Sequence, residues 1–294
     1  MISEQQVEFY RENGFVVVED VLSAAEVSRL REVTDEMVER ARGLTTHDDV
    51  FDLEDTHRPD DPRVRRIKFP DRQHPEYARL VRHPNIVAVL QRLIGPDIRF
   101  DVSKLNMKAA GYGAAVEWHQ DWAFYPHTND DLCAVGIMMD DCEMENGPLL
   151  AIPGSHKGPI LDHHYDGVFC GAINPDTSEI DFAAAVPMTG KAGSITIHHA
   201  RTIHGSAPNT SSKMRRLLLH QYRAADAWPL LGFAEGWERY NSLLVTGRPS
   251  VEPRLAPVPV RLPLPPAAHQ GSIYENQKGL GRRYFQADQA VAAS

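Results

Sequence analysis

Two histidines and one aspartate in this sequence have the residue types and the spacing of a metal site. His119 and Asp121 close a short run, VEWHQD, that has the pattern of a β-strand, and His204 follows a second such run, SITIHH. Side chains two positions apart on a strand point to the same side, so His119 and Asp121 can bind one ion while Gln120 points away. Two histidines and one carboxylate on one face of an iron ion leave the opposite positions open, as oxygen chemistry requires.

The His-x-Asp spacing is a weak signal by itself, because the chain contains two further pairs of this kind. His47 and Asp49 lie in an acidic stretch without a strand pattern, and His164 and Asp166 lie in a long segment between strands. Only the pair at 119 and 121 ends a plausible core strand, with a tryptophan on either side. We therefore expect the metal at that pair.

His204 competes with neighbouring histidines for the place of third ligand. These are His198, His199 and His220. A single buried histidine is more often a hydrogen-bonded structural residue than a ligand. The segment after His204 favours it, because a turn through residues 205–209 precedes a strand that begins at Arg215. A guanidinium there can reach back and bind a carboxylate through two hydrogen bonds. Arg216 is adjacent, only one of the two can point inward, and the residues leave open which.

The composition indicates a globular protein with a full core. Of 294 residues, 42% are hydrophobic and 24% charged, and the formal net charge is −9. This charge, without a basic stripe, argues against a nucleic acid or a membrane surface as partner. The densest positive patch, residues 63–68, suits a small anionic ligand or solvent. Three cysteines without CxxC spacing, and an N-terminus without an apolar run, predict a cytoplasmic protein. The oligomeric state is not readable.

The elements that must position these residues fall into two parts of one domain, 1–294. A helical N-terminal layer (1–96) contains two capping boxes, at Ser3 and Ser23, each of which begins a helix. Residues 43–62 are acidic and irregular, and we expect a loop there. From about 97 to 225, short strands separated by turn residues predict an antiparallel sandwich or barrel. The remainder, 226–294, is a proline-rich extension.

Three segments together resemble the phytanoyl-CoA dioxygenase family of iron(II)- and 2-oxoglutarate-dependent oxygenases. They are WHQD, ENGPLLAIPGSHKG and HGSAPN with its downstream RR. The resemblance covers about residues 4–225. It implies a mainly β protein with a helical layer, whose core is a double-stranded β-helix of the jelly-roll or cupin-like type. It also implies Fe(II), 2-oxoglutarate and O2 as cofactor and cosubstrates.

The resemblance also assigns roles to particular residues. It implies His119, Asp121 and His204 as the iron ligands. Arg215 and Ser206 are implied as the anchor of the distal carboxylate of 2-oxoglutarate. A basic residue on an earlier strand approaches the cosubstrate in many members, and Arg66 or Lys108 matches it. Members often carry a tryptophan on the strand after the iron-binding pair, whereas CAVGIMM has none here.

The resulting functional hypothesis is a dioxygenase that hydroxylates an unactivated C–H bond of a small, partly apolar metabolite, with release of succinate and CO2. The carboxylate of Asp121 favours hydroxylation, because related halogenases replace it with a small residue. Trp122, Phe124 and Tyr125 are expected at the pocket mouth, with ordinary packing as their alternative role. Other oxidative outcomes stay open: desaturation, epoxidation and ring rearrangement. So do a cupin-type dioxygenase or isomerase without 2-oxoglutarate, and a non-catalytic ligand-binding barrel.

Overall fold

The computed structural model describes residues 2–176, 178–233, 235–266 and 272–285. Its N-terminal part opens with helix α1 (Glu4–Asn13), strand β1 (Phe15–Val18) and helix α2 (Ala24–Arg40). Both expected capping boxes are present, because the hydroxyls of Ser3 and Ser23 each accept the backbone N–H three residues later. Three shorter helices complete the layer: α3 (Pro70–Gln73), α4 (Pro75–Leu80) and α5 (Pro84–Ile94).

The acidic stretch 43–62, expected to be a loop, contains strand β2 (Phe51–Leu53). This strand pairs antiparallel with β3 (Val64–Lys68), which is the basic patch of the sequence. Three residues are too few for an alternating pattern to be recognised, and pairing with a neighbour across the sheet stabilises the strand instead. The expectation of an irregular loop was therefore wrong at these three positions.

A large antiparallel sheet forms one side of the core. In the described part of the chain it has eight strands, in the order β1-β11-β6-β13-β4-β3-β2, with β14 also paired to β4. The strands not yet given are β4 (Ile98–Lys108), β6 (Leu132–Met138), β11 (Ile195–His199), β13 (Arg215–Ala224) and β14 (Leu244–Thr246).

A smaller sheet faces the large one. It has the order β10-β7-β12-β5, with β5 (Val116–His119), β7 (Leu149–Ala151), β10 (Val186–Met188) and β12 (His204–Ser206). Leu149 of β7 packs against Met138 and Leu217 on the inner side of the large sheet. A turn was expected directly after His204, but residues 204–206 continue as β12. Two facing antiparallel sheets with a helical layer confirm the expected fold class and agree with a jelly-roll core.

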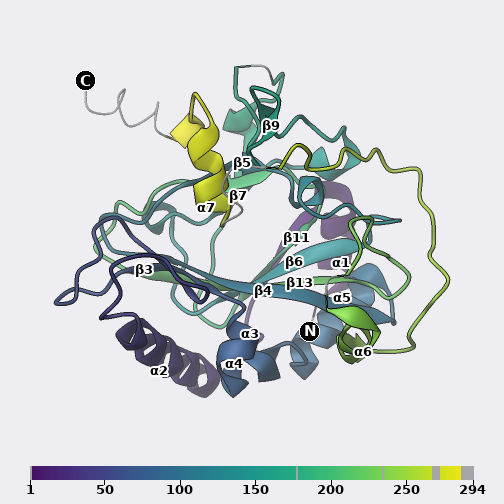
Figure 1. Ribbon diagram of the computed structural model, residues 1–294. Helices are drawn as coiled ribbons and strands as arrows, with labels where there is room; N and C mark the ends of the chain where they lie inside the picture. The colour runs from purple at the N-terminus through teal and green to yellow at the C-terminus, as the bar shows by residue number, and fades with distance from the viewer. Residues whose placement is uncertain (1, 177, 234, 267–271, 286–294) are drawn as a thin grey trace.

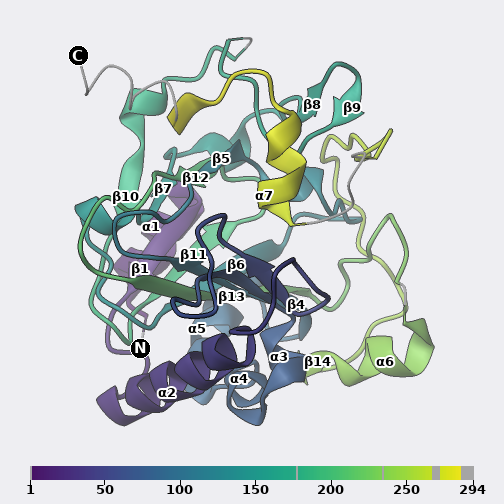
Figure 2. The same cartoon turned by 60° about the vertical axis from the view of Figure 1, so that its left-hand side comes forward.

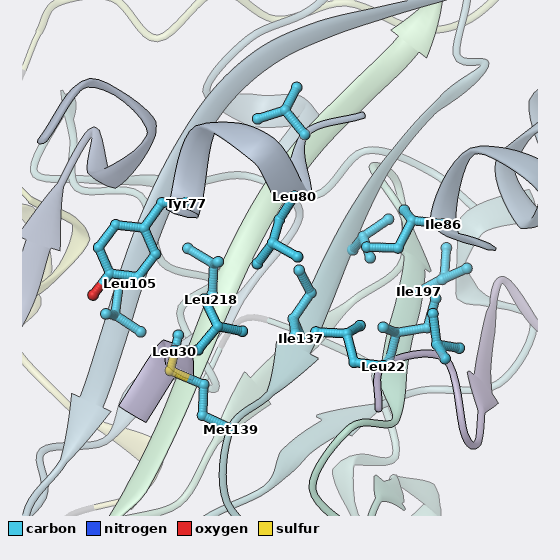
Figure 3. Close-up of a cluster of buried hydrophobic side chains, with 14 of the residues drawn as sticks. Leu22, Leu30, Tyr77, Leu80, Ile86, Leu105, Ile137, Met139, Ile197 and Leu218 are labelled. Atoms are coloured by element: carbon cyan, nitrogen blue, oxygen red, sulfur yellow. The ribbon is translucent and has the colours of Figure 1, made fainter. Parts of the chain in front are cut away.

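The large sheet has two chemically different faces. Its outer face packs on the helices, and Figure 1 shows α2, α3, α4 and α5 gathered on that side. Figure 3 shows the apolar cluster between them, in which Leu218 of β13 and Ile137 of β6 meet Leu80 of α4. Because side chains alternate along a strand, Arg215, Leu217 and the other odd-numbered residues of this part of β13 face the small sheet.

The C-terminal part returns to both sides of the core. Helix α6 (Gly236–Ser242) precedes β14, and helix α7 (Ile273–Asn276) lies beside β5 on the small-sheet side in both views (Figures 1 and 2). The remaining elements of the described residues are a hairpin and five short 3-10 helices. The hairpin consists of β8 (His164–Tyr165) and β9 (Val168–Phe169), and the 3-10 helices are η1 (Asp121–Ala123), η2 (Met144–Asn146), η3 (Ser155–Lys157), η4 (Phe182–Ala184) and η5 (Gln277–Gly279). None of the described helices has the length and apolar character needed to cross a membrane.

Candidate metal and cosubstrate site

The two histidines of the predicted triad are neighbours across the small sheet. His119 ends β5 and His204 begins β12, and the register pairs them directly. Residues opposite one another on antiparallel strands point to the same side, and here the two ring centroids lie 4.1 Å apart. Both side chains are buried. Strand pairing therefore brings together two residues that are far apart in the sequence.

Asp121 completes the cluster from just beyond the strand. It was expected on the strand with His119, but the strand ends at His119 and Asp121 opens the 3-10 turn η1. Its Oδ1 atom still lies 3.9 Å from His119 Nε2. Each residue offers one ligand atom, and these three atoms lie within 4.8 Å of one another. Among the described residues no other group of three or more histidines, cysteines or carboxylates has such spacing.

Backbone hydrogen bonds prepare both histidines for a metal. His119 Nδ1 lies 2.8 Å from the carbonyl oxygen of Glu117, and His204 Nδ1 lies 2.9 Å from that of Thr202. A carbonyl can only accept, so each Nδ1 carries the proton and donates it. Each Nε2 is then left with a lone pair, which is the arrangement that metal-binding histidines use.

The protonation states also suit a metal cation. Burial lowers the pKa of His119 to about 4 and that of His204 well below its usual value, so both are neutral at pH 7. Burial alone would raise the pKa of Asp121, but Lys104, His198 and His204 together hold it well below its usual value. Two neutral imidazoles and one ionised carboxylate are the donor set that a non-haem Fe(II) site requires, and the residues fit that ion.

A ring of polar side chains surrounds the carboxylate of Asp121. His198 Nε2 lies 3.4 Å from Asp121 Oδ2, and Gln221 donates to the same oxygen from 3.4 Å. Gln221 also donates to the hydroxyl of Tyr125. Lys104 of β4 lines the cavity beside these groups. The sequence had suggested His198 only as a rival of His204, but the structure places both at the site, with ring centroids 4.1 Å apart.

The other rival histidines lie away from the triad. His199 lies 4.0 Å from Asp130 and packs against His156, the histidine of the GSHKG motif. His220 faces the outer side of the large sheet, where it contacts Phe100 and lies within 3.2 Å of the hydroxyl of Tyr222. Alternation along β11 explains the difference between His198 and His199, which point to opposite faces.

A narrow cavity extends from the triad between the two sheets. It has about 30 Å³ of solvent-accessible volume. Its lining includes both triad histidines and the side chains of Lys104, Asn106, Ser206, Leu217, Tyr274 and Arg215. Arg215 is buried, and its Nη2 donates to the carbonyl of Gly147 at 3.0 Å.

The surroundings of the two adjacent arginines show which of them points into the cavity. Arg215 points into the cavity, whereas Arg216 points to the opposite side of the sheet. There its guanidinium pairs with Asp140 and Asp35, each at 2.8 Å.

The two basic residues expected near the cosubstrate differ in their surroundings. The ammonium of Lys108 donates to the backbone carbonyls of Ser206 and Ala207 and so holds the end of β12. Arg66 pairs in register with Asn106 and therefore shares its face of the sheet. The buried Nε of Arg66 has no hydrogen-bond partner among the described residues.

The three aromatic residues after the triad lie in different environments. The indole N–H of Trp122 donates to Pro259, and the ring packs in an apolar cluster with Leu132. Phe124 contacts the ring of His119 edge-on, with centroids 5.9 Å apart. Tyr125 reaches the metal site through Gln221. Lys104 and Tyr274 were not singled out from the sequence. Lys104 could have been found, because it lies two and four positions before Asn106 and Lys108 on the same strand face.

Comparisons with known proteins agree with this geometry. The profile of the family described as phytanoyl-CoA dioxygenase (PhyH) matches residues 10–217. The chain belongs to this family. It is 39% identical over 289 residues, 97% of this chain and 100% of the relative, to a probable alpha-ketoglutarate-dependent hypophosphite dioxygenase of Stutzerimonas stutzeri.

Solved structures extend the comparison to the fold. The non-haem alpha-ketoglutarate-dependent carbocyclase SnoK from nogalamycin biosynthesis is 26% identical, with a TM-score of 0.59 over 85% of this chain and 93% of that one. EctD from S. alaskensis with bound Fe is 24% identical, with a TM-score of 0.66 over 87% and 88%. The family protein described here is thus an Fe(II)- and 2-oxoglutarate-dependent dioxygenase, as the sequence motifs had indicated.

Proposed function

We propose that this dioxygenase oxidises hypophosphite to phosphite, with His119, Asp121 and His204 as its iron ligands. In this proposal Arg215 and Ser206 bind the distal carboxylate of 2-oxoglutarate, and Arg66 adds positive charge nearby. Bound iron and 2-oxoglutarate supply the oxidising chemistry, in which O2 and the cosubstrate yield succinate, CO2 and one oxygen atom for the substrate. The proposal includes a single-domain protein in the cytoplasm, which its three free, buried cysteines support.

The observation that carries the substrate assignment is the ammonium group of Lys104. It lines the cavity beside Asp121 and forms no hydrogen bond or ion pair within the described residues. Burial is the main cause that lowers its pKa, and Arg66 adds to the effect while Asp121 opposes it. The side chain is partly buried, and a cation that is partly withdrawn from water is stabilised when a counter-charge completes its surroundings. A small anion bound between Lys104 and the iron would do so.

Hypophosphite matches the charge and the polarity of the space beside Lys104. It is a small anion with two oxygen atoms for hydrogen bonds and two P–H bonds that can be oxidised. Conversion of one P–H bond into P–OH, with the oxygen from O2, gives phosphite and balances the conversion of 2-oxoglutarate into succinate and CO2. The full-length relative at 39% identity carries hypophosphite in its name.

The protein side chains would then bind and orient the anion. Lys104 supplies the charge, and His198, whose Nε2 lies 3.4 Å from Asp121, supplies a hydrogen bond from the neighbouring strand β11. A partly apolar metabolite, expected from Trp122, Phe124 and Tyr125, has less support. Trp122 is enclosed in its own cluster, and Tyr125 presents a hydroxyl rather than an apolar surface to the site.

The direct test is a reconstituted reaction of the purified protein with Fe(II), 2-oxoglutarate, O2 and hypophosphite. Phosphite is measured by phosphorus NMR and succinate by chromatography, and we expect one phosphite for each succinate. The visible band of the Fe(II)–2-oxoglutarate complex is recorded without oxygen in parallel. If the band forms but no phosphite does, the substrate assignment is wrong while the proposed cofactor site stands. If no band forms, the proposed ligand set is wrong.

A substitution at Lys104 tests its role separately. Loss of a charge-assisted hydrogen bond costs roughly 1.5–3 kcal/mol, so Lys104→Met should raise the KM for hypophosphite about tenfold or more. The affinity for 2-oxoglutarate should stay near that of the wild type. Lys191→Met is the matched control, because Lys191 is exposed and pairs with Asp141 at the surface. Equal KM values in the two variants would exclude Lys104 from substrate binding.

A further inference from the structure

The C-terminal segment 272–285 packs against strand β5, which carries His119, through hydrogen bonds and ring stacking. The side chain of Gln277 accepts the backbone N–H of Glu117 at 3.0 Å and donates to the carbonyl of Gly171 at 3.0 Å. The carboxylate of Glu117 in turn accepts the N–H of Tyr284 at 2.9 Å. Phe285 stacks on Trp118 of β5, with ring centroids 5.5 Å apart. Polar and aromatic contacts thus hold this segment against the small sheet.

The first two residues of α7 enter the cavity beside the triad. Ile273 and Tyr274 are both buried and belong to the lining that also contains Arg215. The guanidinium carbon of Arg65 lies over the ring of Tyr274, 4.6 Å from its centroid. Arg65 also pairs with Glu275 at 2.8 Å. The Tyr274 ring is therefore held between this charged pair and the apolar cluster that it forms with Val116 and Ile273.

Several buried polar atoms around this cavity lack a hydrogen-bond partner within the described residues. They are the hydroxyl of Tyr274, Nε of Arg215, Nε of Arg66 and Oδ1 of Asn106. Buried polar groups are nearly always paired, and each unpaired one costs free energy. Burial also raises the pKa of Tyr274, so its hydroxyl keeps the proton and can donate. Two of these donors, the hydroxyl of Tyr274 and Nε of Arg215, belong to residues that line the same cavity, and they suit a ligand with anionic oxygen atoms.

We propose that the hydroxyl of Tyr274 donates a hydrogen bond to the distal carboxylate of 2-oxoglutarate, beside the guanidinium of Arg215. This rests on the proposed function, which places that carboxylate at Arg215. Tyr274 lies outside the residues 10–217 that match the family profile. Helix α7 thereby supplies part of the cosubstrate pocket from a region to which the family motifs assign nothing.

The experiment compares two cosubstrates in two proteins. Iron-loaded wild type and Tyr274→Phe are titrated without oxygen, first with 2-oxoglutarate and then with 2-oxovalerate, which has the same chain length but no distal carboxylate. A hydrogen bond to a charged group predicts a rise of roughly 10- to 100-fold in the Kd of Tyr274→Phe for 2-oxoglutarate. For 2-oxovalerate the two proteins should have the same Kd, because the hydroxyl has no carboxylate to bind. Fe(II) affinity should not change, and the Tm of the ligand-free protein should not fall, because the hydroxyl has no partner there among the described residues.

The control is Tyr112→Phe, which removes a hydroxyl from an exposed tyrosine that is not part of this cavity lining. An unchanged Kd for 2-oxoglutarate in Tyr274→Phe would overturn the inference while leaving the proposed function intact. An equal loss for both cosubstrates would also overturn it, because the ring would then act through packing alone. If the wild type itself forms no complex with 2-oxoglutarate, the proposed function fails together with the inference.

Discussion

The two faces of the large sheet differ in chemistry although they alternate along the same strands. On β13 the outward Leu218 is buried against the helices, while the inward Arg215 and Gln221 point toward the triad. The outer face is an apolar interface, whereas the inner face carries cations and histidines, several of which have buried nitrogen atoms without a hydrogen-bond partner among the described residues. A strand that slipped by one residue would exchange the two sets. The outer face therefore holds the register on which the inner face depends.

The largest expected effect belongs to the inner face. Asp121→Ala removes the only acidic member of the triad, so we expect succinate formation to fall by at least about 100-fold, more than the loss of an outer-shell partner. Asp49→Ala, in the exposed His-x-Asp pair of the N-terminal part, should retain full activity. Circular dichroism checks that both variants are folded. Near-normal succinate release by Asp121→Ala would refute the ligand assignment.

A substitution on the outer face should lower the stability of the protein and leave its activity unchanged. Leu218 is completely buried, and Leu218→Ala should lower the free energy of unfolding by about 2–5 kcal/mol through lost burial and a cavity. Activity per folded molecule should remain at the wild-type level, because the side chain points away from the triad. Leu255→Ala, at a position that is 78% exposed, is the control and should change the free energy of unfolding little. Chemical denaturation and initial rates on the same samples provide the measurement. If Leu218→Ala were as stable as the wild type but inactive, the two faces would not have these separate roles.

The adjacent residues Arg215 and Arg216 test the difference between the two faces of the sheet within a single strand. Arg215→Ala should raise the Kd for 2-oxoglutarate by roughly 10- to 100-fold, because a charge-assisted hydrogen bond is lost. Arg216→Ala should leave that Kd unchanged and lower stability instead, because Asp140 loses its main partner. Anaerobic titration and thermal unfolding of both variants separate the two effects. Similar Kd values for Arg215→Ala and Arg216→Ala would show that cosubstrate binding does not depend on the face to which the arginine points.

Much of this arrangement could be predicted from local patterns. The capped helices at Ser3 and Ser23, the strand that carries His119 and the strand β11 that precedes His204 follow from signals within a few residues. The short strand β12, which carries His204 itself, was not predicted. Alternation also predicted that one of Arg215 and Arg216 must point inward. Which one does so depends on the partners across the sheets, and the family resemblance supplied that choice.

The remaining features depend on contacts between distant segments. Strand β2 exists because β3 pairs with it, and no pattern in three residues indicates that partner. Tyr274 comes from a short helix after a proline-rich stretch, and only tertiary packing on β5 brings it to the cavity. Lys108 was singled out by the family resemblance, and Lys104 lies on the same face of the same strand by the period of two. The ammonium of Lys108 binds a backbone carbonyl, whereas Lys104 lines the cavity. This difference follows from the three-dimensional structure and not from the sequence pattern.

The smallest expected effect concerns pH, and it tests a histidine on the outer face. Burial lowers the pKa of His220 to about 3, whereas an unfolded histidine has a pKa near 6.5. The unfolded chain therefore takes up a proton first, so stability is complete above about pH 6.5 and declines as the pH falls toward 3. In the metal-free protein, His220→Leu should reduce this decline by about 1.4 kcal/mol per pH unit.

His220→Leu should also leave succinate formation at pH 7 unchanged, because His220 lies on the side of the sheet away from the triad. Denaturant unfolding at pH 7.5, 6.0 and 5.0 gives the slope for each protein. An identical slope in the wild type and the variant would mean that His220 is protonated in the folded state as readily as in the unfolded one. The outer face would then admit water at this position, and its separation from the polar face would be incomplete there.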